Sequence, residues 1–237
     1  MPVRIWHQSI TALDGLGAYR AALARRLPGL VRPGTEVVLH GLPAACYGER
    51  PPAEVLRDPG RREQLHALFL AEVCRAQDEG FDAVACMTFA EPHLAEARRR
   101  LSIPVVSTLE SSLRAGCAQA ARLGLVTLGP GSVARLGEKV AGHGRGERVA
   151  GIFPLEPAMD EVRLLNGFEE PGPVVAAFAA AARAAIAAGA DAVIPAEGVL
   201  GEVLAAAGVR RVDAARVIDG AAVTLAHAET MVRLSRA

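Results

Sequence analysis

Short apolar runs alternate with longer amphipathic segments along the whole chain. The apolar run at 3–7 precedes a helical pattern at 17–27, and the run at 81–87 follows another helical pattern at 61–80. The same alternation continues into the second half of the sequence. Because parallel strands need crossover connections that are usually helical, this pattern predicts an α/β fold.

Two stretches of the sequence resemble each other. "EGFDAVACMTFAEP" and "AGADAVIPAEGVLG" each follow a long amphipathic segment and share Gly-x-Asp-Ala-Val. When Gly80 is aligned with Gly189, Thr88 and Glu197 both fall eight residues after the glycine. The repeat predicts two pseudo-symmetric lobes with the active site between them.

Each lobe is expected to hold parallel strands joined by helices. Residues 1–106 with 212–237 are expected to form the first lobe, and residues 107–211 the second. In open parallel sheets, ligands bind beyond the carboxyl ends of the strands. Substrate-binding and catalytic residues are therefore expected just after the carboxyl ends of the strands.

Thr88 and Glu197 are the candidate catalytic residues because they follow two such strands. Glu197 is suited to proton transfer if partial burial raises the pKa of its carboxyl group towards neutrality. Thr88 is a poor proton acceptor, because its hydroxyl is not activated. Each residue also has a structural interpretation, since Glu197 could favour the start of the following helix and Thr88 could cap one.

Four segments together resemble a known family: "FDAVACMTFAEPHLAEARRRLSIPVVSTLESS", "GLVTLGPGSVARLGEKVAGHG", "GADAVIPAEG" and "VIDGAAVTLAHAETMV". The chain is similar to the aspartate/glutamate/hydantoin racemase superfamily, nearest the hydantoin racemase branch. The resemblance implies two pseudo-symmetric lobes, each a mostly parallel sheet of about four strands flanked by helices. It also implies no cofactor and an interlobe site where two cysteines serve as acid and base. The first cysteine maps onto Thr88 and the second onto Glu197, so both are replaced. If the family motif is placed two residues earlier in this chain, the first catalytic cysteine of the family corresponds to Cys86 instead of Thr88.

Further polar residues at strand ends and in nearby loops are candidate substrate contacts. Tyr47, in a loop rich in proline and glycine, could close over the cleft and donate to a carbonyl. Ser132 in "LGPGS" precedes a helix, where amides and a hydroxyl could hold a carboxylate, although a plain turn explains it equally. The full set is His7, Gln8, Ser9, Tyr47, Glu110, Thr127 and Ser132.

Composition narrows the choice of partner. The 26 basic and 26 acidic side chains cancel, so no global charge favours nucleic acid or an acidic membrane surface. No apolar block resembles an export signal or a membrane span, and the four cysteines show no metal-ligand spacing. We therefore expect a cytoplasmic protein with a small-molecule substrate and without metal or cofactor. Alanine-rich helix faces would permit a homo-oligomer.

The leading hypothesis is a cofactor-independent isomerase that moves a proton at a carbon alpha to a carbonyl, in a small carboxylate or hydantoin-like substrate. A decarboxylase of the same superfamily and a non-catalytic binding or regulatory protein stay open as alternatives. "GPGSVA" matches two glycines of a dinucleotide fingerprint, with Glu156 as the acidic partner, but carries Ala134 at the third position. No Gly-x-Ser-x-Gly elbow supports an acyl hydrolase.

Overall fold

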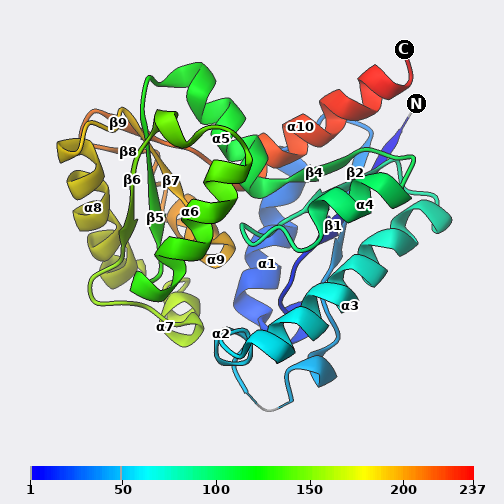
Figure 1. The fold of residues 1–237 in the computed structure, drawn as a ribbon, viewed down its shortest axis with the longest axis horizontal. Coiled ribbons are helices and arrows are strands. Elements are labelled where there is room, and N and C mark those ends of the chain that lie inside the picture. The colour runs from blue at the N-terminus through cyan, green and yellow to red at the C-terminus, as the bar shows by residue number, and fades with distance from the viewer. Residues whose placement is uncertain (1, 49) are drawn as a thin grey trace. The chain divides into compact units, whose positions relative to one another are not determined.

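The chain folds into two compact units, each with its own sheet and helices (Figure 1). A computed structural model describes residues 2–48 and 50–237. One unit runs up to Thr108 and resumes at Thr224, and the other is the continuous segment Leu109–Val223. Both sheets are mostly parallel and carry helices, which confirms the predicted α/β fold.

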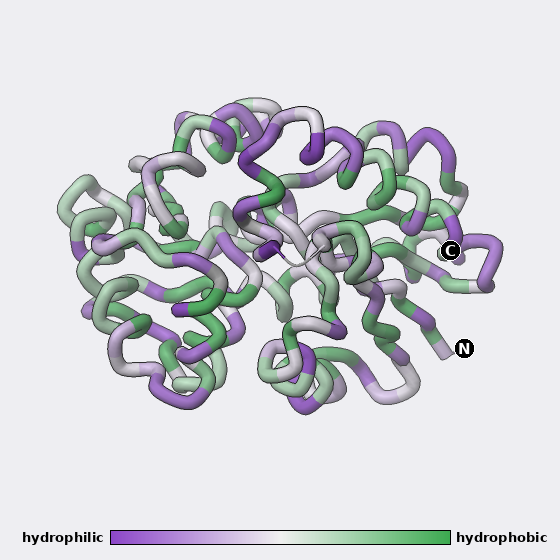
Figure 2. The backbone as a smooth tube through the Cα atoms, turned by 90° about the horizontal axis from the view of Figure 1, so that it is seen from below, coloured by the Kyte–Doolittle hydropathy of each residue, from purple (hydrophilic) through white to green (hydrophobic). Residues whose placement is uncertain are grey.

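The first unit contains a four-stranded sheet in the order β2-β1-β3-β4, and every pair is parallel. The strands are β1 (Val3–Gln8), β2 (Thr35–His40), β3 (Ala83–Cys86) and β4 (Val105–Ser107). The central strand β3 is buried along its whole length, as its unbroken apolar sequence predicts. Hydrophobic and hydrophilic stretches alternate along the backbone in Figure 2.

Five helices accompany this sheet: α1 (Gly17–Arg26), α2 (Pro52–Val55), α3 (Pro59–Asp78), α4 (Leu94–Arg100) and α10 (Gly220–Ser235). The long α3 begins with proline at its first position, and the Asp58 carboxylate accepts the Arg61 amide at 2.7 Å. Helices α3 and α4 pack beside each other on one face of the sheet, over a core that includes Trp6 and Val84. On α10, the buried Glu229 accepts from the Arg32 amide and the Thr35 hydroxyl.

The second unit contains a five-stranded sheet in the order β6-β5-β7-β9-β8. Its strands are β5 (Leu123–Thr127), β6 (Val149–Pro154), β7 (Ala192–Pro195), β8 (Arg211–Val212) and β9 (Ala215–Val217). The short β8 is antiparallel to β9, and the other pairs are parallel. The helices are α5 (Thr108–Gln119), α6 (Val133–Gly142), α7 (Glu161–Asn166), α8 (Pro171–Ala187) and α9 (Gly198–Ala206).

The sequence repeat corresponds to the same local geometry in both units. Gly80 and Gly189 both adopt positive φ angles, +74° and +93°, and their strands β3 and β7 begin three residues later. In the first unit, the Arg4 amide donates to the Asp82 carboxylate at 2.8 Å, and the Asp82 amide donates back to the Arg4 carbonyl at 2.8 Å.

The second unit repeats this exchange. The Arg122 amide donates to the Asp191 carboxylate at 3.0 Å, and the Asp191 amide donates to the Arg122 carbonyl at 2.9 Å. Each arginine side chain also donates to a backbone carbonyl at the end of the helix that precedes the repeat glycine, Arg4 to Glu79 after α3 and Arg122 to Ala188 after α8. The aspartate of Gly-x-Asp-Ala-Val therefore ties two neighbouring parallel strands together at their amino ends.

The expected lobe boundaries differ in detail from the compact units. The sequence placed the divisions after residues 106 and 211, whereas strand β9 pairs with β7 of the second sheet and the second unit extends to Val223. The assignment of independent domains stays a prediction. No helix in the described part of the chain combines the length and the apolar sequence needed to cross a membrane.

We predict that Gly189→Ala lowers the free energy of unfolding by about 1–2 kcal/mol, because an L residue is strained at positive φ. The added Cβ would also lie 3.0 Å from the Arg122 guanidinium. The matched control is Gly172→Ala on α8, where a Cβ meets nothing within 4 Å. Urea unfolding should show a loss for Gly189→Ala and none for the control. Equal stability of the two variants would contradict this interpretation of the repeat.

Candidate active site

Polar residues gather where the strands of the first sheet end. Ser9 directly follows β1, Thr88 follows β3 by two residues, and Thr108 directly follows β4. The Met87 amide donates to the Gln8 carbonyl at 2.8 Å, so β1 and β3 stay joined up to this edge. Because neighbouring parallel strands end at the same edge, Ser9 and Thr88 lie next to each other along it.

The Thr88 hydroxyl is arranged to donate a hydrogen bond. Its Oγ1 accepts from the Ala90 amide at 3.3 Å, and Thr88 makes no other hydrogen bond with the described residues. A hydroxyl that accepts from an amide keeps its own hydrogen for another partner. Helix α4 begins only at Leu94 and is not capped by a side chain, so Thr88 is not a helix cap.

Glu91 is a buried carboxylate in the loop after Thr88, and the sequence analysis did not single it out. It accepts a hydrogen bond from the Ser107 hydroxyl, and both side chains are buried. Glu91 and His93 both adopt φ of +47°, a conformation that non-glycine residues avoid and that gathers at functional sites. The signal in the sequence was an acidic residue between a strand end and a proline, in "AEPH".

Cys86 is unsuited to proton transfer. It is the last residue of β3 and is buried. Burial, and secondarily the negative charge of Glu91, raises the pKa of the thiol to about 12. The thiol therefore stays protonated near neutral pH, whereas nucleophilic or basic chemistry needs the thiolate.

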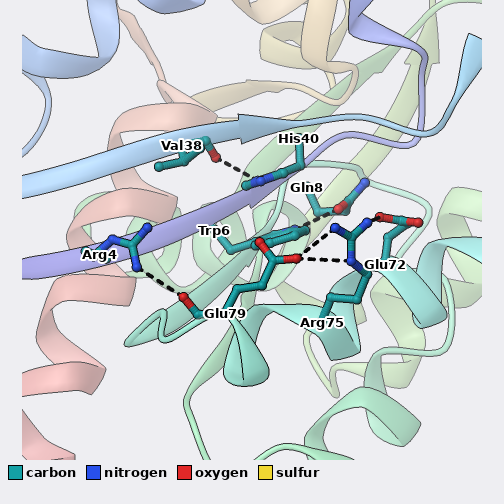
Figure 3. Close-up of polar contacts among 8 residues, drawn as sticks. All are labelled: Arg4, Trp6, Gln8, Val38, His40, Glu72, Arg75 and Glu79. Atoms are coloured by element: carbon teal, nitrogen blue, oxygen red, sulfur yellow. Dashed lines mark hydrogen bonds and ion pairs between the residues drawn. The ribbon is translucent and has the colours of Figure 1, made fainter.

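Gln8 and Tyr47 make hydrogen bonds inside the first unit. The Trp6 indole donates to Gln8 Oε1 at 2.7 Å (Figure 3). Gln8 Nε2 donates to the Ser9 carbonyl at 3.0 Å. The Tyr47 hydroxyl donates to the Ile10 carbonyl. Direct contact of Gln8 and Tyr47 with a substrate stays a prediction.

His7 is fully buried on the face of β1 opposite Trp6. Neither ring nitrogen has a hydrogen-bond partner among the described residues. Burial removes the solvation of the imidazolium and, with minor repulsion from His40, lowers the pKa of His7 to about 4. His7 is therefore a neutral imidazole near pH 7.

Polar residues also follow neighbouring strands of the second sheet. Thr127 ends β5, Glu197 follows β7 by two residues, and Asp219 follows β9 by two residues. Strand β7 lies between β5 and β9, and the Ala196 amide donates to the Val126 carbonyl at 2.7 Å. The Glu197 carboxylate therefore lies at a central strand end.

Glu197 is the N-cap of α9. Its Oε2 accepts from the Leu200 amide at 2.7 Å, and the residue is half-buried. The positive end of the helix dipole stabilises a negative charge at this position. Glu197 therefore has the helix-capping role that the sequence allowed, and the same hydrogen bond fixes the orientation of its carboxylate.

Asp219 is a second carboxylate at this edge that the sequence analysis did not single out. Its Oδ1 accepts from the Ala222 amide at 3.1 Å, and its Oδ2 lies 3.7 Å from Arg210 Nη1. The signal was the strand-end Asp-Gly of "VIDGAA".

The remaining candidates lie at helix starts in the second unit. Ser132 precedes α6 without capping it through its side chain. Glu110 lies in the first turn of α5, buried, with its Oε1 2.7 Å from Arg114 Nη2. Within residues 2–48 and 50–237, no three His, Cys, Asp or Glu side chains come close enough to hold a metal ion.

Comparison with known proteins decides the family. A family model described as Asp/Glu/Hydantoin racemase matches residues 18–228. This chain belongs to that racemase family. No curated protein shows significant sequence similarity to it.

Solved structures of two racemases and of a decarboxylase share the fold. Allantoin racemase from Klebsiella pneumoniae aligns with a TM-score of 0.78 at 20% identity, covering 98% of this chain and 88% of that one. Allantoin racemase from Pseudomonas fluorescens aligns with a TM-score of 0.72 at 22% identity, covering 98% and 92%. The Gly74Cys-Cys188Ser mutant of arylmalonate decarboxylase aligns with a TM-score of 0.55 at 18% identity, covering 98% and 93%.

We predict that His7 makes the stability of this racemase-family protein depend on acid pH. In the folded state its pKa of about 4 lies below the ordinary histidine pKa of 6.5, so between pH 6.5 and pH 4 only the unfolded state takes up the proton. Stability is therefore kept above pH 6.5 and falls towards pH 4, by about 3 kcal/mol over the full range.

The measurement is urea unfolding across this pH range. His7→Leu should lose less stability on acidification than the wild type, whereas a His143→Gln control should follow the wild type. Identical pH profiles for all three proteins would show that His7 does not carry the effect.

Proposed function

We propose that this chain is a cofactor-independent isomerase of the racemase or epimerase class. It moves a proton at a carbon alpha to a carbonyl in a small carboxylate or hydantoin-like substrate. The supporting observation is Glu197, a half-buried carboxylate at the end of β7, held by the Leu200 amide in the fold of a racemase family. The sequence repeat supports Thr88 as its counterpart at the end of β3.

In this proposal the two residues have unequal roles. Glu197 takes the proton from the substrate carbon, and charge develops on the adjacent carbonyl oxygen as an enolate forms. A water molecule on the opposite face returns a proton to that carbon, and Glu197 releases the proton it took to solvent. Thr88 donates its remaining hydroxyl hydrogen to a substrate oxygen, because its Oγ1 already accepts from Ala90. Positioned donors of this kind stabilise the charge that builds up in the transition state.

Hydantoin-like compounds are the first substrates to test. Two similar structures are named allantoin racemases, and allantoin carries a substituted hydantoin ring. Its ring carbonyl acidifies the neighbouring carbon, as the proposed proton transfer requires. Amino acids belong in the same panel, since the family name also covers aspartate and glutamate racemases.

Decarboxylation is the second candidate reaction. Glu197 is one strong acid/base group, and loss of carbon dioxide followed by protonation of the resulting carbanion needs only one. An arylmalonate decarboxylase mutant is among the similar structures. Assays with arylmalonates that measure released carbon dioxide separate this reaction from isomerisation.

We predict that Glu197→Gln slows solvent-deuterium incorporation into a turned-over substrate by about 10²–10⁴-fold, the range of a general base. The amide oxygen of glutamine can still accept from Leu200, so the start of α9 should be preserved. Asp160→Asn is the matched control, because Asp160 caps α7 in the same unit and accepts from the Arg163 amide at 2.9 Å. The control should exchange deuterium at the wild-type rate.

Undiminished deuterium incorporation by a folded Glu197→Gln variant would rule out Glu197 as the base. If the wild type binds members of the panel yet exchanges no proton and releases no carbon dioxide, the chain is a binding protein. Calorimetric titration with the same compounds makes that distinction.

For Thr88 we predict that Thr88→Val lowers kcat about a hundredfold, the cost of losing one positioned donor. Thr88→Ser keeps the hydroxyl and should retain most of the activity. Steady-state rates of both variants on the best substrate of the panel provide the measurement. Equal activity of the valine and serine variants would remove Thr88 from the chemistry.

A further inference from the structure

The turn at residues 9–11, directly after β1, is anchored by two side chains. We propose that Gln8 and Tyr47 are positioning residues, which fix this turn for substrate binding and do not themselves contact substrate. The inference rests on the proposed function for the reaction it serves. The proposal gives Gln8 and Tyr47 an indirect role, whereas the sequence predicted that both contact the substrate.

Gln8 holds the carbonyl of Ser9. Both ends of its amide are bonded within the protein. Its Oε1 accepts from the Trp6 indole (Figure 3), and its Nε2 donates to the Ser9 carbonyl. Trp6 and Gln8 have no exposed surface. The indole is fixed in turn, since it stacks on the His40 ring at 3.3 Å between centroids. Gln8 therefore links a rigid aromatic pair to the turn.

Tyr47 holds the carbonyl of Ile10. Its hydroxyl donates to that oxygen from the loop after β2, and its side chain is buried. Close packing also restrains the turn, because a Cβ on Gly41 would lie 2.5 Å from the Thr11 carbonyl oxygen. The Ser9 amide donates to the His40 carbonyl at 2.8 Å. Segments far apart in the sequence thus fix one short turn.

These anchors determine where the donors of the turn point. In a trans peptide the N–H points opposite to the preceding carbonyl, so tying the carbonyls of Ser9 and Ile10 inwards turns the amides of Ile10 and Thr11 the other way. The Thr11 amide donates to Ser9 Oγ at 3.2 Å. The Ile10 amide has no acceptor among the described residues.

The two hydroxyls of the turn add a second donor. Ser9 Oγ and Thr11 Oγ1 share one hydrogen bond at 2.8 Å, which uses one of their two hydrogens. Neither hydroxyl donates elsewhere among the described residues. One hydroxyl hydrogen and the Ile10 amide therefore remain, and two such donors match a carboxylate or carbonyl oxygen.

The first experiment measures the turn without any substrate. Tyr47→Phe removes only the hydroxyl that holds Ile10, so amide hydrogen exchange of Thr11 should accelerate about tenfold, the usual effect of one lost hydrogen bond. The matched control is Thr35→Val, which removes a hydroxyl bonded to Glu229 at the amino end of the same sheet. The control should leave the exchange of Thr11 unchanged.

The second experiment is a double-mutant cycle on deuterium incorporation into 5-substituted hydantoins. Tyr47→Phe should lower kcat/KM about tenfold in the wild-type background and have little further effect in a Ser9→Ala background. A merely structural role of Tyr47 would give additive losses. Gln8→Met should show the same non-additivity, because it also acts through Ser9.

Failure of this inference is distinguishable from failure of the proposed function. Unchanged Thr11 exchange in Tyr47→Phe overturns the positioning role whatever the activity. Additive losses in the cycle overturn it as well. If the wild type exchanges no proton in any substrate, the proposed function fails, and binding of the same hydantoins by calorimetry replaces kcat/KM in the cycle.

Discussion

In each unit, an aspartate exchanges two hydrogen bonds with the backbone of an arginine, one through its carboxylate and one through its amide, and this pair sets the register on which the strand end depends. Asp82 ties β3 to β1 at Arg4, and Asp191 ties β7 to β5 at Arg122. A slip of one residue would reverse the direction of every side chain along the strand. The two aspartates occupy the same position in the repeat. Thr88 and Glu197, each eight residues after the repeat glycine, therefore both lie two residues beyond a buried strand.

The repeated strand end carries a different polar side chain in each unit, Thr88 in the first and Glu197 in the second. The hydroxyl of Thr88 accepts from a nearby amide and so keeps a hydrogen to donate. The carboxylate of Glu197 accepts from the first turn of α9, which fixes its orientation. The repeat thus ends in a hydrogen-bond donor in the first unit and in a hydrogen-bond acceptor in the second.

Local patterns in the sequence were sufficient to predict the α/β class, the alternation of strands and helices, and the repeat around Gly80 and Gly189. The antiparallel strand β8 could not be predicted, because two residues carry no usable periodicity. The bond from Tyr47 to Ile10 joins residues 37 positions apart, so only tertiary packing reveals it. Glu91 was missed because its left-handed backbone and its burial come from the loop around it and not from its residue type.

Because helix α10 lies at the end of the chain, the residues of the two units are completed at different times during translation. The second unit is one continuous segment ending at Val223, so all its residues have been made before the ribosome reaches the end of α10. The first unit resumes at Thr224, within α10, and Glu229 on this helix accepts hydrogen bonds from Arg32, before β2, and from Thr35, the first residue of β2. Since domains fold as units during translation, the first unit cannot be completed until all residues of the second unit have been made.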